Sequence, residues 1–359
     1  MRTWVQRIRA ISAGIAPVMG VALLAAAAEA QTPAAGQTPA GQDDPAKTQA
    51  VLTDLKAAMG GDKAAAVKSL SAEGSARVTF GDREATNDVQ FKIVLPDHIQ
   101  RIMTPDMPNG MPGPRLATTL NGNDAWFGSL DPIPNFGGGP GGGGGQGRGP
   151  GGGGGFGGMF GGGGPDQSQR LRGDMLRLLL GMSAAPDTLP GVTFSYLGTA
   201  QSKDGGEADV LGVKGEGLEA KLFIDKKTHL PLMATYMARD LSRIRRPGGP
   251  GGPGGPGGGP NGPNAATAPP ADPNETPEAR QKRLADEAQK RREEFRKQME
   301  SAPMVENQLF YADYKKVDGV MLPHRFTRAV NGNPAEETEI KKYKLNPKID
   351  LSDFQKKGS

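Results

Sequence analysis

The fold is decided near the C-terminal end of the chain, where residues 308–344 read QLFYADYKKVDGVMLPHRFTRAVNGNPAEETEIKKYK. Within this stretch Asp318-Gly319 separates the first apolar run from the second, and Asn331-Gly332 separates the second from the third. Asp-Gly and Asn-Gly are typical of two-residue hairpin turns, because both turn residues tolerate positive φ. The stretch therefore predicts three antiparallel strands, over 308–317, 320–330 and 337–344.

The same turn chemistry recurs through the rest of the chain. Asn121-Gly122 and Asp204-Gly205 each separate two apolar runs, and residues 89–95 alternate between apolar and polar side chains as a half-buried strand does. The pattern predicts about ten strands in an antiparallel meander, and it favours one large curved sheet or barrel. The remaining expected strands cover residues 76–80, 99–103, 116–120, 125–128, 192–200, 208–213, 218–224 and 230–236.

Three helices are expected beside these strands. Residues 47–59 carry apolar side chains at helical spacing and end at Gly60-Gly61, and residues 167–182 form an amphipathic helix. Residues 276–300 begin with Thr276 as a cap and Pro277 in the first turn. The apolar stripe of this last helix is thin, so we expect it to be solvated and to lie outside the main fold.

Glycine and proline set the domain organisation. The chain of 359 residues holds 55 Gly and 31 Pro, and 31 of the Gly and 8 of the Pro lie within residues 137–164 and 247–263. Such tracts cannot bury apolar surface and lose much backbone entropy on ordering, so they predict disordered insertions. We therefore expect a single domain over 46–359, interrupted by a Gly-rich loop at 137–165 and by a Pro/Gly-rich linker with the charged helix at 247–302.

The first thirty residues have the features of a secretory signal peptide. Three arginines precede an apolar, Ala-rich run that ends in Ala28-Glu29-Ala30, which predicts cleavage before Gln31 and a flexible linker over 31–45. The alternative is an uncleaved anchor, but the run is shorter than the roughly 20 residues of a spanning helix. The chain contains no cysteine, so the fold needs no disulfide and the cleavage site carries no lipid. A periplasmic or exported protein, with no integral membrane segment after cleavage, is expected.

No sequence motif for catalysis, metal binding or a cofactor is present. His98, His229 and His324 stand far apart, outside any metal-ligand spacing, and we expect them at strand ends or on the sheet surface. Without the leader the net charge is close to neutral, which gives no electrostatic reason to expect a nucleic-acid partner. The sequence thus predicts no catalytic residue, no metal and no cofactor.

Apolar positions on the expected strands are the candidate site. They would line either an apolar ligand cavity in a curved sheet or an ordinary packed core, and the residues alone leave both open. The predicted cavity residues are Phe91, Ile93, Trp126, Phe194, Leu222 and Phe326. The helix at 167–182 would close this cavity as a lid through Leu171, Met175, Leu178, Leu179 and Met182.

Three motifs resemble the outer-membrane lipoprotein-sorting (LolA-like) family of periplasmic carriers. Residues 311–323, YADYKKVDGVMLP, are similar to its V-D-G-x-x-L-P strand pair, and 223–232, FIDKKTHLPL, to its I/L-D-x-x-T-x-L-P hairpin. Residues 121–126, NGNDAW, resemble its N-G-x-x-x-W turn and strand. The resemblance implies an antiparallel incomplete β-barrel, or half-barrel, with covering helices.

The resemblance also implies a function and its partners. It suggests a soluble, non-enzymatic carrier or binder of a lipid, of lipoprotein acyl chains or of another apolar ligand. Both insertions depart from the family pattern, so apolar-ligand carriage is the safer expectation than lipoprotein sorting itself. The alternative is an envelope interaction or structural protein with a filled barrel, which acts on an envelope protein partner through its low-complexity inserts and charged helix.

Overall fold

Twelve antiparallel strands form one open sheet in the computed structural model, which describes residues 44–80, 83–106, 111–131, 165–183, 186–202, 205–240 and 276–356. The expected mainly-β fold with an unclosed antiparallel barrel is confirmed, and each of its twelve strands overlaps one of the stretches named above, which slightly exceed the approximate count of ten. The signal peptide, most of the N-terminal linker and both Gly/Pro-rich tracts lie outside the described residues. The strands are β1 (Ser69–Phe80), β2 (Arg83–Val94), β3 (His98–Pro105), β4 (Leu116–Asn121), β5 (Asp124–Ser129), β6 (Thr193–Gln201), β7 (Glu207–Gly215), β8 (Leu218–Asp225), β9 (Pro231–Arg239), β10 (Met304–Val317), β11 (Val320–Val330) and β12 (Asn333–Leu345).

The order of the strands in the sheet is β5-β4-β3-β2-β1-β12-β11-β10-β9-β8-β7-β6. Two meanders, β1–β5 and β6–β12, therefore join where the first strand pairs with the last, and β5 and β6 form the two free edges. The predicted hairpin turns have the expected backbone: φ is 49° at Asp318 and 93° at Gly319, and 50° at Asn331 and 76° at Gly332. These positive φ values match the two-residue turns that Asp-Gly and Asn-Gly favour.

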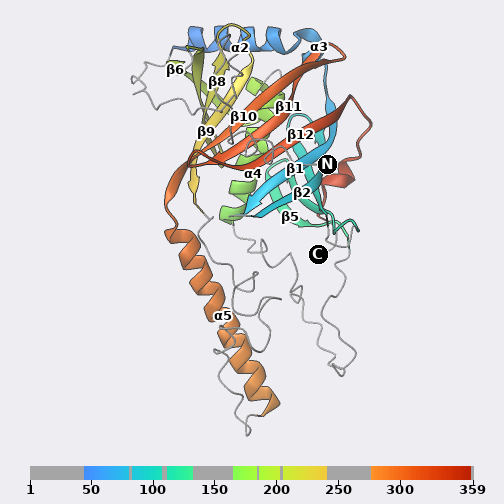
Figure 1. Ribbon diagram of the computed structural model, residues 1–359, viewed down its shortest axis with the longest axis vertical. Coiled ribbons are helices and arrows are strands. Elements are labelled where there is room, and N and C mark those ends of the chain that lie inside the picture. The colour runs from blue at the N-terminus through green and yellow to red at the C-terminus, as the bar shows by residue number, and fades with distance from the viewer. Residues whose placement is uncertain are drawn as a thin grey trace, which may run out of the picture.

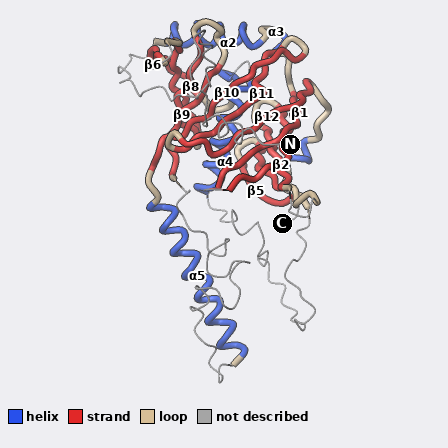
Figure 2. Tube along the Cα trace, in the orientation of Figure 1, coloured by secondary structure: helices blue, strands red, loops and turns tan. Residues whose placement is uncertain are grey.

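Four α-helices accompany the sheet in the described part of the chain. Helix α2 (Pro45–Met59) and the short α3 (Asp62–Ala65) lie across one end of it, at the top of Figure 1. Helix α4 (Pro165–Met182) contacts β4 and β5 of one meander and β8, β9 and β11 of the other, so the sheet curves around this helix (Figure 2). Helix α5 (Pro277–Ser301) extends away from the sheet, as expected for residues 276–300 (Figure 1).

Helix α2 begins as its sequence dictates. The side chain of Asp44 caps it by accepting a hydrogen bond of 2.9 Å from the backbone N–H of Lys47, and Pro45 occupies the first turn. Its apolar face, with Leu55 and Met59 fully buried, packs on the core. The helix ends at Gly60, where φ is 127° and an added Cβ would lie 2.7 Å from the carbonyl oxygen of Gly319. Glycine thus fixes the end of α2 against the β10–β11 hairpin.

The C-terminal segment covers the outer face of the first meander. The short 3-10 helix η3 (Leu351–Phe354) contacts β3 and β4, and the side chain of Phe354 is fully buried there. The Nζ atom of Lys92 lies 2.8 Å from a carboxylate oxygen of Asp353, and the amide of Gln100 donates to the carbonyl oxygen of Asp353 over 2.7 Å. This half of the sheet is therefore contacted on both faces, on the inner face by α4 at β4 and β5 and on the outer face by η3 at β3 and β4.

Candidate functional site

Helix α4 lies within the curve of the sheet and is the centre of the candidate site. Of its five predicted lid residues, Met175, Leu179 and Met182 are buried, whereas Leu171 and Leu178 are half-buried. Two further leucines that the prediction missed, Leu176 and Leu180, are also buried. More of the surface of α4 is buried than its single apolar stripe predicts, because strands of both meanders contact the helix.

Two glycines bring α4 very close to the strands. A Cβ added at Gly173 would lie 2.1 Å from the carbonyl oxygen of Gly217, and one added at Gly181 would lie 2.2 Å from the ring of Tyr311. Distances this short leave no room for a side chain, so the sequence needs glycine at both positions. Gly181 therefore allows close packing against the strands, although glycine has a low helix propensity.

Hydrogen bonds fix α4 in this position. The hydroxyl of Tyr311 donates to the carbonyl oxygen of Arg177 over 2.7 Å. One and a half turns earlier in the helix, Arg172 Nη1 donates to Asn123 Oδ1 over 2.8 Å and to the carbonyl oxygen of Gly122 over 3.2 Å. Arg172 and Arg177 are both buried, although their charge predicts a solvated face. The middle of the helix is thus held by polar contacts to both meanders, at the β4–β5 turn and at β10.

Charged side chains gather on the inner face beside the middle of α4. The guanidinium of Arg177 lies 3.8 Å from the ring centroid of Tyr236 and Nη1 pairs with Asp174 at 2.8 Å. Glu336 of β12 forms ion pairs with Arg101 of β3 and, at 3.8 Å, with Arg328 of β11. Burial alone would raise the pKa of Glu336, but the two guanidiniums hold it below its ordinary value.

An apolar cavity of about 390 Å³ lies beneath α3, between the C-terminal end of α4 and the inner face of the sheet. Leu70, Ile93 and Leu345 are direct cross-strand neighbours on β1, β2 and β12, so their side chains share this face. Leu179 and Met182 complete the lining from α4. The volume falls at the lower end of the range of about 300–1,000 Å³ for small-molecule sites, and the lining is mostly apolar as such sites require.

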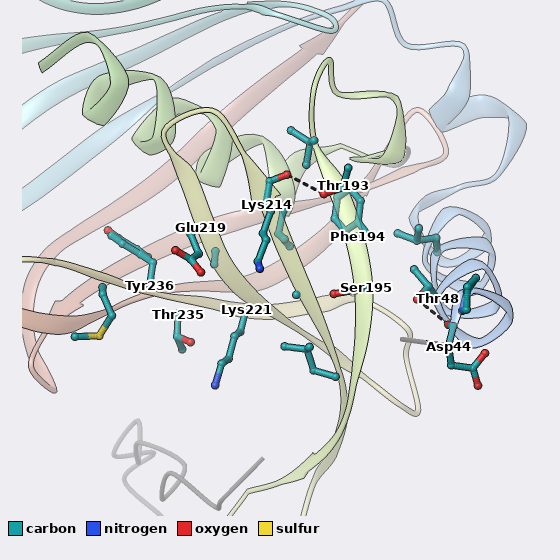
Figure 3. A pocket seen from close by; sticks show the side chains of 18 of the residues that line it. Asp44, Thr48, Thr193, Phe194, Ser195, Lys214, Glu219, Lys221, Thr235 and Tyr236 are labelled. Atoms are coloured by element: carbon teal, nitrogen blue, oxygen red, sulfur yellow. Dashed lines mark hydrogen bonds between the residues drawn. The ribbon is translucent and has the colours of Figure 1, made fainter. Parts of the chain in front are cut away.

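A larger cavity of about 1140 Å³ lies between the first turns of α2 and strands β6–β9 (Figure 3). Ser195 pairs with Gly212, Gly212 with Lys221 and Lys221 with Thr235, so a polar row crosses the sheet along one wall. Lys214 and Glu219 form a second polar pair beside this row. In Figure 3 these side chains lie across β6 from Asp44 and Thr48 of α2. This cavity is mixed in charge and more polar than the first.

The six predicted cavity residues do not gather at one place. Ile93 lines the apolar cavity and Phe194 lines the larger one. Phe91, Leu222 and Phe326 are at most 3% exposed in the core around α4. Trp126 pairs with Thr119 on the face opposite to the core, where its indole donates to the carbonyl oxygen of Phe354 over 3.2 Å.

The histidines are not arranged for metal binding. His98 begins β3, with Nδ1 2.8 Å from Asp97, and His229 lies in the turn between β8 and β9 with φ of 55°. His324 differs from the expectation of a surface position, because it is buried within β11 against the ring of Tyr343. The described residues contain no group of three or more His, Asp or Glu side chains that could hold a metal ion, and none of their helices is long and apolar enough to span a membrane.

Comparisons with known proteins give similarity at the level of solved structures. A LolA superfamily protein from Nitrosomonas europaea is 12% identical, with a TM-score of 0.42 over 86% of this chain and 97% of the other. A domain described as an outer membrane lipoprotein-sorting protein, from Vibrio parahaemolyticus, is 11% identical, with a TM-score of 0.42 over 87% of this chain and 97% of the other. A DUF1329 family protein from Desulfovibrio piger is 10% identical, with a TM-score of 0.39 over 86% and 97%.

Two of these three structures carry the family name that the motifs at 121–126, 223–232 and 311–323 resemble. No protein-family model matches the chain, and no curated protein matches its sequence. The strand order and register of the sheet define the fold.

Sequence reasoning missed most of the apolar cavity. Lys56 and Lys68 line it, and so does Ala64 of α3, although none of them belongs to an expected strand face. One signal was available, and only for Lys56. It follows the buried Leu52 by four residues and the buried Leu55 by one, which places it near the core-facing side of α2. The loop that carries α3 and its folding back over β11 are tertiary features, and no local sequence pattern encodes them.

Proposed function

We propose that this protein is an exported, non-enzymatic carrier or binder of a lipid or another apolar ligand. The observation that carries the proposal is the apolar cavity beside the C-terminal end of α4. It lies inside the curve of the sheet, and the buried side chains of Leu70, Ile93 and Leu322 line it. Such a lining provides no catalytic constellation but gains free energy from covering apolar ligand surface.

The position of α4 sets the size of ligand that can enter. In the present arrangement the helix fills most of the interior, with Leu176, Leu179 and Leu180 at most 2% exposed. A ligand that fits about 390 Å³ can bind beside the helix, whereas a ligand with several acyl chains requires α4 to move outward. The proposal therefore predicts a binding protein whose capacity depends on this one helix.

The first test is native mass spectrometry of the protein purified from its own cells, followed by solvent extraction of whatever accompanies it. A stoichiometric lipid or other apolar compound supports the proposal and identifies the ligand class. An apo mass, together with no uptake of a fluorescent acyl probe by delipidated protein, overturns the proposal.

A pair of substitutions locates the binding site. Val67 is half-buried in the lining of the apolar cavity, and Val192 is half-buried in the lining of the larger cavity. We expect Val67→Trp to fill the smaller cavity and weaken binding of an acyl probe at least tenfold, whereas Val192→Trp leaves binding unchanged. The unfolding midpoint of each variant serves as the control for folding, and the reverse result would place the ligand in the larger cavity.

The second candidate function is an envelope interaction protein that acts through its inserts. Two observations favour it: α4 fills much of the interior, and α5 extends away from the sheet (Figure 1). Deleting residues 137–164 and 247–300 separates the two functions. Binding of an acyl probe survives this deletion if the protein is a carrier, whereas binding of an envelope partner is lost if the inserts are the working parts.

A further inference from the structure

The charges around the apolar cavity have one sign. Its lining contains Lys56 and Lys68 and no aspartate or glutamate. The larger cavity differs, because Asp44, Glu219 and Glu306 line it together with two lysines, Lys214 and Lys221. The smaller cavity therefore combines apolar walls with positive charge only, and this combination complements a ligand with an apolar body and a negative end.

The two lysines stand at the rim of the cavity. Lys56 lies in the last turn of α2 and Lys68 directly precedes β1, so the pair flanks α3, which covers the cavity. Both residues are exposed, whereas Leu70 and Ile93 below them are buried. Neither ammonium forms an ion pair or hydrogen bond to any residue that the structure describes. A negative group at the rim would thus meet two unpaired cations without first breaking an ion pair.

The arginines beside α4 are a weaker anion site by the same criteria. Arg177 is paired with Asp174, and Arg101 and Arg328 are paired with Glu336, so an incoming anion would have to displace a carboxylate. None of these three arginines lines either of the two cavities described above. The unpaired lysines at a cavity rim are therefore the better site for the charged end of a ligand.

We infer that the ligand is an anionic amphiphile with a single acyl chain, whose chain fills the apolar cavity and whose carboxylate or phosphate lies between Lys56 and Lys68. This inference rests on the proposed function and names its ligand class. The volume of about 390 Å³ suits one chain without displacement of α4. Because both lysines are exposed, the electrostatic part of the affinity weakens as ionic strength rises.

The test is calorimetric titration of the delipidated full-length protein with C12 ligands that differ only in their head. We expect dodecanoate and dodecyl phosphate to bind at least tenfold more tightly than the neutral glycerol monododecanoate at low salt. The double variant Lys56→Glu/Lys68→Glu should abolish this difference. The matched control Lys214→Glu/Lys221→Glu, in the larger cavity, should retain it.

Each other result has a defined meaning. Equal binding of neutral and anionic ligands overturns the inference and leaves the proposed function standing, and so does an unchanged preference in the Lys56→Glu/Lys68→Glu variant. Binding of inorganic phosphate as tightly as dodecyl phosphate shows a free-anion site and also overturns the inference. Failure of all C12 ligands to bind overturns the inference, and only together with an apo mass in the native measurement does it overturn the proposed function as well.

Discussion

Helices α4 and α5 both follow a Gly-rich or Pro/Gly-rich tract in the sequence, yet they occupy opposite environments. Helix α4 is enclosed by strands of both meanders, and even Arg172 and Arg177 on it are buried. Helix α5 extends away from the sheet, and its charged residues pair along the helix, as Arg283 does with Glu287 at 3.2 Å. Charge content alone therefore does not decide whether a helix is buried. Gly173 and Gly181 let α4 approach the sheet closely, and the hydroxyl of Tyr311 bonds to it there.

The largest expected effect of a substitution is on α4. Leu180→Ala removes a fully buried side chain, and we expect it to lower the free energy of unfolding by about 2–5 kcal/mol. The matched change on α5 is Phe295→Ala, where the side chain is half-buried on a helix that extends away from the sheet, and we expect a smaller loss of about 1 kcal/mol or less. Urea unfolding measures both. Similar losses of unfolding free energy on the two helices would contradict the difference in burial between α4 and α5.

The second prediction concerns the glycine contact of α4. In a solvated helix Gly→Ala stabilises by about 1 kcal/mol, because alanine has the higher helix propensity. At Gly181 we expect the opposite sign, a destabilisation of about 1–3 kcal/mol, because the new methyl group would lie 2.2 Å from the buried ring of Tyr311. A shift of the urea midpoint to higher concentration in Gly181→Ala would show that α4 is free to move from the sheet.

The third prediction uses the charges on the inner face. The folded protein lowers the pKa of Glu336, so this carboxylate contributes stability above the ordinary glutamate pKa of 4.5, and that stability is lost as pH falls through the lower, folded-state pKa. We expect Glu336→Gln to destabilise the protein at pH 7 and to differ less from wild type near pH 3.

The matched control for this pH series is Glu337→Gln, because Glu337 keeps 43% of its side chain exposed. We expect this variant to follow the wild type at every pH. Urea midpoints across the series measure both variants, and parallel curves for Glu336→Gln and the wild type would contradict the assigned pKa.

The smallest expected effect is at the base of α5. Arg239 Nη1 donates to the carbonyl oxygen of Ala302 over 3.2 Å, and Arg239 itself pairs with Met304 across β9 and β10. We expect Arg239→Lys to change the unfolding free energy by less than about 0.5 kcal/mol, since lysine keeps a charged donor at this half-buried contact. A larger loss would indicate that α5 contributes to the stability of the sheet.

The hairpins could be predicted from the sequence because their signal is local. Asn331-Gly332 and Asp318-Gly319 have positive φ, as predicted, and residues between them alternate as strands do. The full length of β1 was missed, because the strand carries Gly74 at a shift in its register with β12. There an added Cβ would lie 1.9 Å from the carbonyl oxygen of Glu339, so the glycine reflects a close strand approach that no local pattern reveals.

The candidate site could be predicted only in part, since it depends on which face of each strand points inward. Ile93 lines a cavity, whereas Trp126 lies on the outer face under Phe354. A shift of one residue along a strand exchanges its two faces, so an apolar residue on both faces of a short strand leaves the choice open. The guanidinium of Arg177 packs on the ring of Tyr236, far away in the sequence, so its burial could not be read from the helix itself.

The pairing of β1 with β12 has a consequence for how the chain folds. Leu70 pairs with Leu345, so the two meanders join only through strands whose paired residues lie 275 positions apart in the sequence. Contacts between such distant parts of a chain slow folding, because a large loop must close before they form. The two meanders are thus expected to form early as local hairpins, and their union is expected to be the slow step.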